Sequence, residues 1–347
     1  MCGIAGLFIG CALEAVCPKR LLAQDLSAAP EQEPYKSKFG DWYERSTVRA
    51  APRRMVLKDE QGLFFSPDFI PIMKHPLIQE QSDTVKRNIM VQQLYRYLDF
   101  TAKLEHVVVN RVAMSIANGY LDFNLPREMV FDAYKIYCDE AYHALFSADL
   151  LMQVEDLTGI RAVTQQLQPY FIRRLHELQH QYSESNLQEL VEIFFVIISE
   201  TLISGFLSDI PTARDVKPSI RAVVRDHAID EGKHHVYFAD FLKRIWPQLD
   251  RRYRKEIGKL LPSLIYAFLS PDVDSIRTEL SSYGIPRDHI EQVIAETYTK
   301  EIVSSHIANS ISSLGRYLRE LGILDDPEVQ DRFYEAGLLK REDLILG

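Results

Sequence analysis

The sequence predicts an all-α protein built on a four-helix bundle, and three observations support this fold class. From about residue 85 onward, long segments with helical periodicity are separated by Gly and Pro turn signals, whereas strand-like alternation is scarce. The motif Glu-x-x-His occurs twice, and a single glutamate in an apolar segment precedes each copy. This order is typical of a bundle in which two helices each supply a Glu and two others each supply a Glu-x-x-His pair.

The boundaries of the predicted helices follow from turn residues. Asn118-Gly119 and Thr158-Gly159 are helix stops, and Asn186 is a candidate N-cap. We expect helical segments at 85–118, 127–158, 164–183 (shorter and polar), 186–209, 218–246, 250–269, 272–282 and 287–321.

Residues 1–84 make up the rest of the chain. They contain most of the early prolines and mixed charges, and long helical periodicity is absent from them. We therefore expect an irregular arm with short helices that packs onto a helical domain at 85–347.

The composition argues against several classes of function. A net charge of -9, with no compensating stripe of Lys and Arg, argues against a nucleic-acid partner. The nearest approach to a membrane span, at 190–207, contains Glu192 and Glu200, so we expect no membrane partner. The cysteines form no CxxC motif, which favours a reducing cytoplasm as the location. They are Cys2, Cys11, Cys17 and Cys138.

The glutamates of the repeated pattern are candidate metal ligands. Glu105 and Glu200 lie among apolar neighbours, where an unpaired carboxylate would cost several kcal/mol or be forced neutral. For a single buried Glu, we would favour pairing with a buried Arg. The full set instead favours metal cations, because they compensate several carboxylates at once. It consists of Glu105, Glu140, His143, Glu200, Glu231 and His234.

His227 is a candidate seventh ligand. His227, Glu231 and His234 are spaced i, i+4 and i+7, so at about 100° per residue they fall within roughly 60° of one helix face. The alternative is a core or surface histidine without a metal. Oxygen and nitrogen ligands without a thiolate suit iron or manganese, and a carboxylate-rich site with open positions suits O₂ chemistry at iron. We therefore expect two non-haem Fe ions, with O₂ as co-substrate.

Asp139 and Asp230 directly precede the two paired glutamates. We predict that each accepts a hydrogen bond from the non-ligating nitrogen of a ligand histidine in the other half of the bundle. An ordinary surface aspartate is the alternative for both.

With these seven positions the chain resembles the diiron arylamine N-oxygenases typified by p-aminobenzoate N-oxygenase (AurF) and by CmlI. The resemblance covers about residues 65–322, and His227 is its most specific part, because ordinary ferritin-like oxygenases have six ligands. It implies a ferritin-like bundle and a monooxygenase that converts a primary, aromatic amine through hydroxylamine and nitroso stages to a nitro product. It further implies a homodimer and a role in antibiotic biosynthesis.

The resemblance also implies roles for individual residues. Glu140 and Glu231 would bridge the two irons. Glu105 and His143 would complete one iron, and Glu200, His227 and His234 the other. Glu140, Glu231 and His227 would be the residues closest to catalysis.

The chain departs from the p-aminobenzoate enzyme where substrate would bind. Ser204 lies one turn beyond Glu200, at a position where a polar residue is expected, and His306 stands where a carboxylate-binding Arg would be expected. Tyr97, two turns before Glu105, either lines the pocket entrance or belongs to the core.

Two other functions stay open at this level. The same ligands could support hydroxylation or desaturation of carbon, because they determine O₂ activation and not the atom attacked. An iron-storage or structural bundle is a third class, disfavoured because storage subunits are shorter and lack His227. The sequence contains no flavin or nicotinamide fingerprint, so we expect an external electron donor or reductase.

Overall fold

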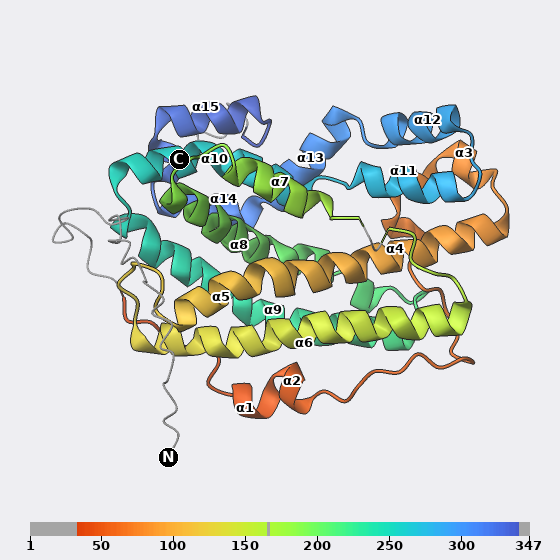
Figure 1. Cartoon of the computed structure of the whole chain (residues 1–347), viewed down its shortest axis with the longest axis horizontal. Coiled ribbons are helices and arrows are strands. Elements are labelled where there is room, and N and C mark those ends of the chain that lie inside the picture. The colour runs from red at the N-terminus through yellow and green to blue at the C-terminus, as the bar shows by residue number, and fades with distance from the viewer. Residues whose placement is uncertain (1–32, 165–166, 340–347) are drawn as a thin grey trace, which may run out of the picture.

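Four helical rods form the centre of the molecule. The computed structural model describes residues 33–164 and 167–339, apart from the side chains of Ser204 and Phe206. Its bundle consists of α4 (Asp83–Lys103) continued by α5 (Asn110–Ala117), α6 (Arg127–Thr158), α8 (Ser185–Leu207) and α9 (Pro218–Ile245). α6 packs along α4, α5 and α9, and α8 packs most extensively on α9 (Figure 1).

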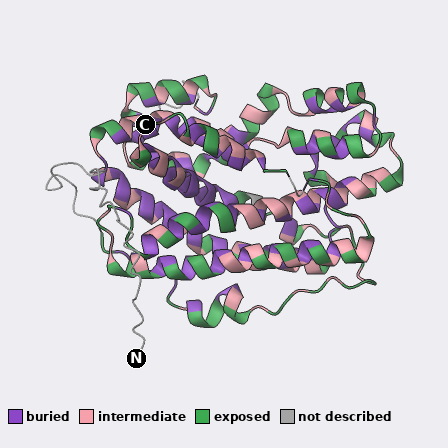
Figure 2. Cartoon of the chain, in the orientation of Figure 1, coloured by how far each residue is buried: buried purple, intermediate pink, exposed green. Residues whose placement is uncertain are grey.

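The predicted all-α class is confirmed. The described residues form no strand, and their single β-bridge joins Leu63 to Val216. α8 is buried around nearly its whole circumference from Leu190 to Ile203, as an apolar helix at the centre of a large protein should be (Figure 2). No helix in the described part of the chain is long and apolar enough to cross a membrane.

A second layer of helices lies on the side of the bundle opposite α6 (Figure 1). Here α10 packs on α7, α8 and α15, and α14 packs on α8. The layer comprises α7 (Tyr170–Gln179), α10 (Arg251–Leu269), α11 (Val273–Ser282), α12 (Arg287–Thr297), α13 (Lys300–Ser310), α14 (Ser312–Glu320) and α15 (Pro327–Glu335).

Two predicted helices have different bounds in the structure. The segment expected at 287–321 is three helices, because Thr299 has an extended backbone and its hydroxyl accepts a hydrogen bond from the amide of Ile302, which starts α13. A second break at Ile311 separates α13 from α14. The segment expected at 164–183 is helical only over α7, which begins after Pro169.

The first described residues run along the outside of the bundle. Two one-turn helices, α1 (Trp42–Arg45) and α2 (Thr47–Ala50), lie below α6 in Figure 1, and α2 contacts both α6 and α9. Further on, α3 (Pro76–Gln79) contacts α12. Residues 1–32 of the predicted arm lie outside the described residues, and the boundary at residue 84 stays a prediction.

Candidate metal centre

All four rods of the bundle contribute side chains to one buried cluster. Glu105 comes from the segment that joins α4 to α5, one pair comes from α6, Glu200 comes from α8, and three residues come from α9. Each of these side chains is 0–1% exposed. The cluster consists of Glu105, Glu140, His143, Glu200, His227, Glu231 and His234.

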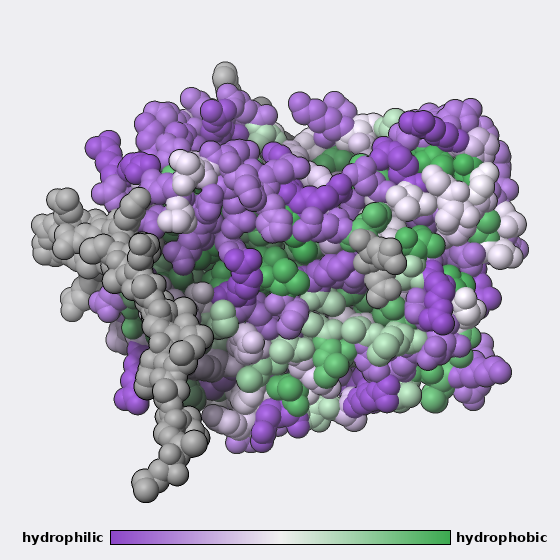
Figure 3. Space-filling view, in the orientation of Figure 1, coloured by the Kyte–Doolittle hydropathy of each residue, from purple (hydrophilic) through white to green (hydrophobic). Residues whose placement is uncertain are grey.

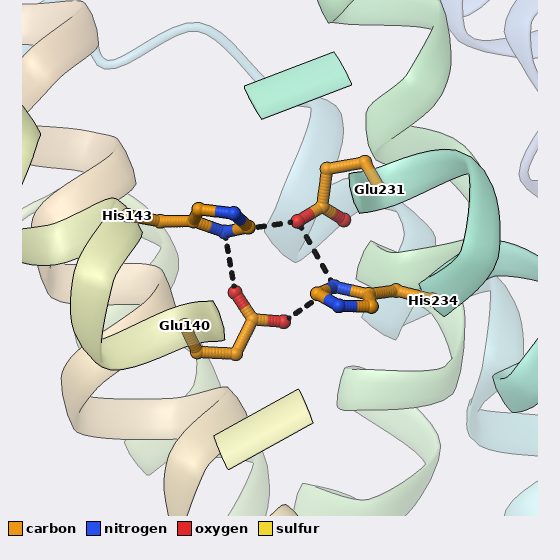
Figure 4. Close-up of side chains that lie close together, drawn as sticks. All are labelled: Glu140, His143, Glu231 and His234. Carbon is orange, nitrogen blue, oxygen red and sulfur yellow. Dashed lines mark hydrogen bonds and ion pairs between the residues drawn. The ribbon is translucent and has the colours of Figure 1, made fainter. Parts of the chain in front are cut away.

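The two Glu-x-x-His pairs face each other across the bundle. Nδ1 of His143 lies 2.9 Å from Glu140 and 3.3 Å from Glu231. Nδ1 of His234 lies 2.9 Å from Glu140 and 3.1 Å from Glu231. Glutamates and histidines therefore alternate around a common centre, as Figure 4 shows. One ligand atom from each of the four lies within 4.8 Å of the others, a grouping that could hold a metal ion.

The other three members extend this centre. Nε2 of His227 lies 3.3 Å from Glu231 and 3.5 Å from Glu105, and Glu200 lies 3.9 Å from Nδ1 of His234. Two further groups could hold a metal: Glu105, His227 and Glu231; and Glu105, Glu140 and Glu200. The structure thus brings all seven sequence-identified residues together, with room for more than one cation among them.

Glu105 lies in a π-helical segment, η4 (Leu104–Val109), between α4 and α5. Single π turns inside α-helices occur frequently at functional sites, because the wider turn changes the direction in which side chains leave the helix. The sequence predicts one regular helix over 85–118 and does not predict this feature. The one available signal is the run of β-branched residues Val107, Val108 and Val109, which weakens regular α-helical packing.

The cluster has unsatisfied polar atoms that fit a metal. Both carboxylate oxygens of Glu105 and Glu200, and both ring nitrogens of His227, are buried without a hydrogen-bond partner. The ion-pair partners of the cluster carboxylates are the three cluster histidines, and not the buried Arg of the alternative interpretation. Such groups would be costly to bury alone, whereas two divalent cations would balance four carboxylates.

Burial and mutual charge shift the ionisation of the cluster. Burial raises the pKa of Glu105 well above its usual range, and the neighbouring glutamates raise it further. Glu200 is shifted upward for the same two reasons. Burial alone would raise the pKa of Glu231 too, but the contacts with His234, His143 and His227 outweigh it and lower that pKa well below the usual range. A bound cation would therefore stabilise this centre, because it would compensate the excess of buried negative charge.

Asp139 and Asp230 each contact a cluster histidine on the opposite helix. Asp139, on α6, lies 3.3 Å from Nε2 of His234 on α9. Asp230, on α9, lies 3.4 Å from Nε2 of His143 on α6. Both aspartates are 1% exposed, so they are not surface residues. Each can hold the ring of its histidine so that the other nitrogen, Nδ1, faces the cluster.

An apolar pocket lies beside the cluster. Its volume is about 430 Å³, and it lies between α4, α8, α10, α11 and α13. Tyr97 and His306 both line it, whereas the side chain of Ser204 lies outside the described residues. Burial raises the pKa of the Tyr97 hydroxyl, and the charges of Glu105 and Glu231 add to this effect, so Tyr97 lies between the pocket and the cluster.

Comparisons with known proteins agree with this site. A search of curated proteins found no match. The family model of p-aminobenzoate N-oxygenase AurF matches residues 39–322, which extends the resemblance from residue 65 back to residue 39 and includes the whole cluster. The chain therefore belongs to the p-aminobenzoate N-oxygenase AurF family, and it is an N-oxygenase, an enzyme of the oxidoreductase class.

Proposed function

We propose that this protein holds two iron ions and uses O₂ to oxidise a primary, aromatic amine, through hydroxylamine and nitroso stages, to a nitro product. The observation that carries the proposal is the fully buried cluster of four glutamates and three histidines, together with its family membership. Carboxylate and imidazole donors without a thiolate suit iron that reacts with O₂.

We assign the ligands as follows. Glu140 and Glu231 would be shared by the two ions, because both lie near His143 and His234. Glu105 and His143 would help to hold one ion, and Glu200 and His234 would help to hold the other. The resemblance assigns His227 to the ion of Glu200, whereas its 3.5 Å separation from Glu105 favours the other ion. A metal-bound crystal structure decides between the two assignments.

The pocket supports a small-molecule substrate. Thr101 and Ile203 both line it. Thr101 precedes Glu105 by about one helical turn, and Ile203 follows Glu200 by about one helical turn. A substrate bound there reaches the cluster with one end, while the apolar wall excludes water from the reacting amine. When bound, the irons would supply electrons that reduce O₂, and the oxygen transferred to the amine would come from O₂. Such a pocket also argues against a storage or structural bundle.

The decisive experiment combines iron analysis with a single turnover. Protein loaded anaerobically with Fe(II) is mixed with O₂ and a panel of arylamines, and the products are analysed by mass spectrometry. We expect about two Fe per chain and a product with two oxygens more and two hydrogens fewer than the amine. Oxygen on carbon, or a new double bond, would replace this proposal with the hydroxylase or desaturase alternative. Protein that binds no iron would exclude the N-oxygenase, the hydroxylase and the desaturase alike.

We further propose an external electron donor or reductase, a cytoplasmic location and a homodimer. Exposed apolar residues recur on the outer face of α6 at spacings of three, eleven and seven, which at about 100° per residue place them on one face of the helix, as in a helix that packs on another. Figure 3 shows apolar residues gathered over this part of the surface. The exposed residues are Phe131, Tyr134, Leu145 and Met152, at 51%, 47%, 62% and 56% exposure. A second copy of the chain is the partner that we assign to this face.

A further inference from the structure

The pocket beside the cluster has a distinctive balance of charge. Among the described residues that line it, Arg96 is the one Arg or Lys. Its guanidinium forms an ion pair with Glu279, whose side chain is 0% exposed, and it also contacts Gln93. The second oxygen of Glu279 accepts a hydrogen bond from the Tyr283 hydroxyl at 3.0 Å. The positive charge in the pocket wall is therefore already neutralised by the protein.

The acidic residues of the lining are also satisfied. Asp99 accepts a hydrogen bond from Lys103 at 2.7 Å, and Asp272 accepts hydrogen bonds from the amides of Tyr170 and Ser275. Gln165, Gln166, Ser204 and Phe206, which lie in sequence beside lining residues but outside the description of side chains, carry no charge. His306 is the one histidine among the described lining residues, and it is exposed.

We propose that this pocket selects arylamines whose far end is uncharged, and that the Arg96–Glu279 pair excludes aminobenzoates. A carboxylate entering the pocket would lose its water without gaining a free counter-charge, whereas a neutral group would not. This inference rests on the proposed function, because it takes the pocket as the substrate site. If it holds, the substrate of this chain differs from p-aminobenzoate, the compound that gives the family its name.

The test compares p-aminobenzamide with p-aminobenzoate, which differ mainly in charge. Binding to Fe(II)-loaded protein is measured anaerobically by equilibrium dialysis at pH 8. We expect the amide to bind at least about tenfold more tightly. Equal or tighter binding of the carboxylate, or binding of neither compound, overturns the inference. If the amide binds preferentially but yields no oxidised product, the proposed function fails and the selectivity stands.

A second experiment tests the role of the ion pair through a gain of carboxylate binding. Glu279→Gln releases Arg96, so p-aminobenzoate should then bind at least as well as the amide. The control is Asp99→Asn, which also removes a lining carboxylate, but one whose partner, Lys103, lies outside the lining; it should keep the preference for the amide. If Glu279→Gln does not fold, Ile302→Lys, which adds a cation at a 52% exposed position of the lining, should shift binding toward p-aminobenzoate. An unchanged preference for the amide in whichever of these variants folds overturns the proposed role of charge in the pocket.

A second inference comes from an independent observation at the N-terminal helices. Trp42, in α1, donates its indole N–H to Asp139, with both oxygens 2.9 Å from Nε1. Thr47, in α2, donates both its amide, at 3.2 Å, and its hydroxyl to Asp230. The two one-turn helices thus supply hydrogen-bond donors to the two aspartates that contact the cluster histidines.

These contacts form two matching relays from the surface segment to the cluster. One runs from Trp42 through Asp139 to His234, and the other runs from Thr47 through Asp230 to His143. Trp42 contacts both carboxylate oxygens of Asp139, and Thr47 donates to Oδ2 of Asp230, the oxygen that also contacts His143. These donors limit rotation of the two carboxylates, and the aspartates then fix the histidine rings.

We infer that Trp42 and Thr47 are positioning residues of the metal centre, and that they act through Asp139 and Asp230. The matched control is Tyr35, whose hydroxyl donates to Asp132 at 2.8 Å. This bond joins the same N-terminal segment to the same helix, α6, but the partners of Asp132 among the described residues are Tyr35 and Lys135, and neither belongs to the cluster. Losing it should cost stability without affecting metal affinity.

The experiment is a Co(II) titration of the full-length protein, followed through the visible absorption bands of the bound ion. We expect Trp42→Phe and Thr47→Val each to weaken Co(II) binding about tenfold, and Thr47→Ser to restore it because the hydroxyl is kept. Tyr35→Phe should bind as wild type does. In an Asp139→Asn background, Trp42→Phe should have no further effect, since the relay is already broken.

The outcomes separate this inference from the proposed function. Wild-type protein that binds no metal contradicts the proposed function and the relay together. Metal binding in which Trp42→Phe and Thr47→Val match Tyr35→Phe contradicts the relay alone. If Trp42→Phe does not fold, comparing the Co(II) affinities of Thr47→Val and Thr47→Ser tests the same inference at His143.

Discussion

Nε2 of His227 lies 3.3 Å from a carboxylate oxygen of Glu231, one turn further along the same helix. Both side chains are buried, and the ring nitrogens of His227 have no hydrogen-bond partner among the described residues. A buried imidazole in this position is available to a metal that Glu231 also binds. It is this residue that extends the centre beyond the two Glu-x-x-His pairs and their lone glutamates.

Replacing His227 tests whether the centre has seven members. His227→Ala should lower the affinity for one of the two iron ions by about 10-fold or more and reduce turnover accordingly. Iron content after gel filtration and initial rates with a substrate amine measure the two effects. Full iron loading together with wild-type turnover would show that the centre has six ligands and that His227 is a core residue.

Replacing Glu200 should have opposite effects on stability and on metal binding. Burial and neighbouring carboxylates raise the pKa of Glu200 well above its usual range, so its side chain is unfavourable in the metal-free protein. Glu200→Leu should raise the free energy of unfolding of metal-free protein by about 1–3 kcal/mol, while abolishing binding of one iron. Urea denaturation and iron analysis provide the two measurements. Ser199→Ala, at a buried neighbour on the same helix, is the control and should keep the iron. A destabilised metal-free Glu200→Leu protein would contradict this account of the site.

Iron should stabilise the folded protein strongly. A ligand that binds only the native state at 100 times its Kd adds about 2.7 kcal/mol to the free energy of unfolding. Anaerobic Fe(II) should therefore raise the thermal midpoint of wild type. The rise should be smaller in Glu105→Ala, which removes two buried carboxylate oxygens that have no hydrogen-bond partner among the described residues. Differential scanning calorimetry under argon measures both. Midpoints that rise equally in the two proteins would place the iron elsewhere.

Sequence patterns identified the cluster because helix geometry is periodic. A Glu-x-x-His pair places both side chains on one face of a helix, and an acidic residue inside an apolar helix is costly enough to require an explanation. The spacing of His227 follows the same rule. These are local properties, and they survive folding because the four rods are regular over most of their length.

Features that depend on distant packing could not be read in this way. Trp42 and Thr47 contact aspartates far along the chain, and nothing in their local sequence distinguishes them from ordinary residues of a short helix. The π turn at Glu105 arises where α4 and α5 adapt to α6. The ion pair of Arg96 and Glu279 joins α4 to α11, so the charge of the pocket also depends on tertiary contacts.

The outer face of α6 yields a prediction about assembly. Leu145 is 62% exposed at the centre of the apolar stripe, so a charge there would be buried against the second copy of the chain without a partner. Leu145→Glu should convert the dimer into a monomer, with metal content unchanged because the side chain faces away from the cluster. Sedimentation velocity at several protein concentrations measures the assembly state. Ile229→Glu, at a 52% exposed position on α9, is the matched control and should remain dimeric. If wild type sediments as a monomer, or if Leu145→Glu and Ile229→Glu both remain dimers, the copies do not associate through this face, and its apolar residues require another explanation.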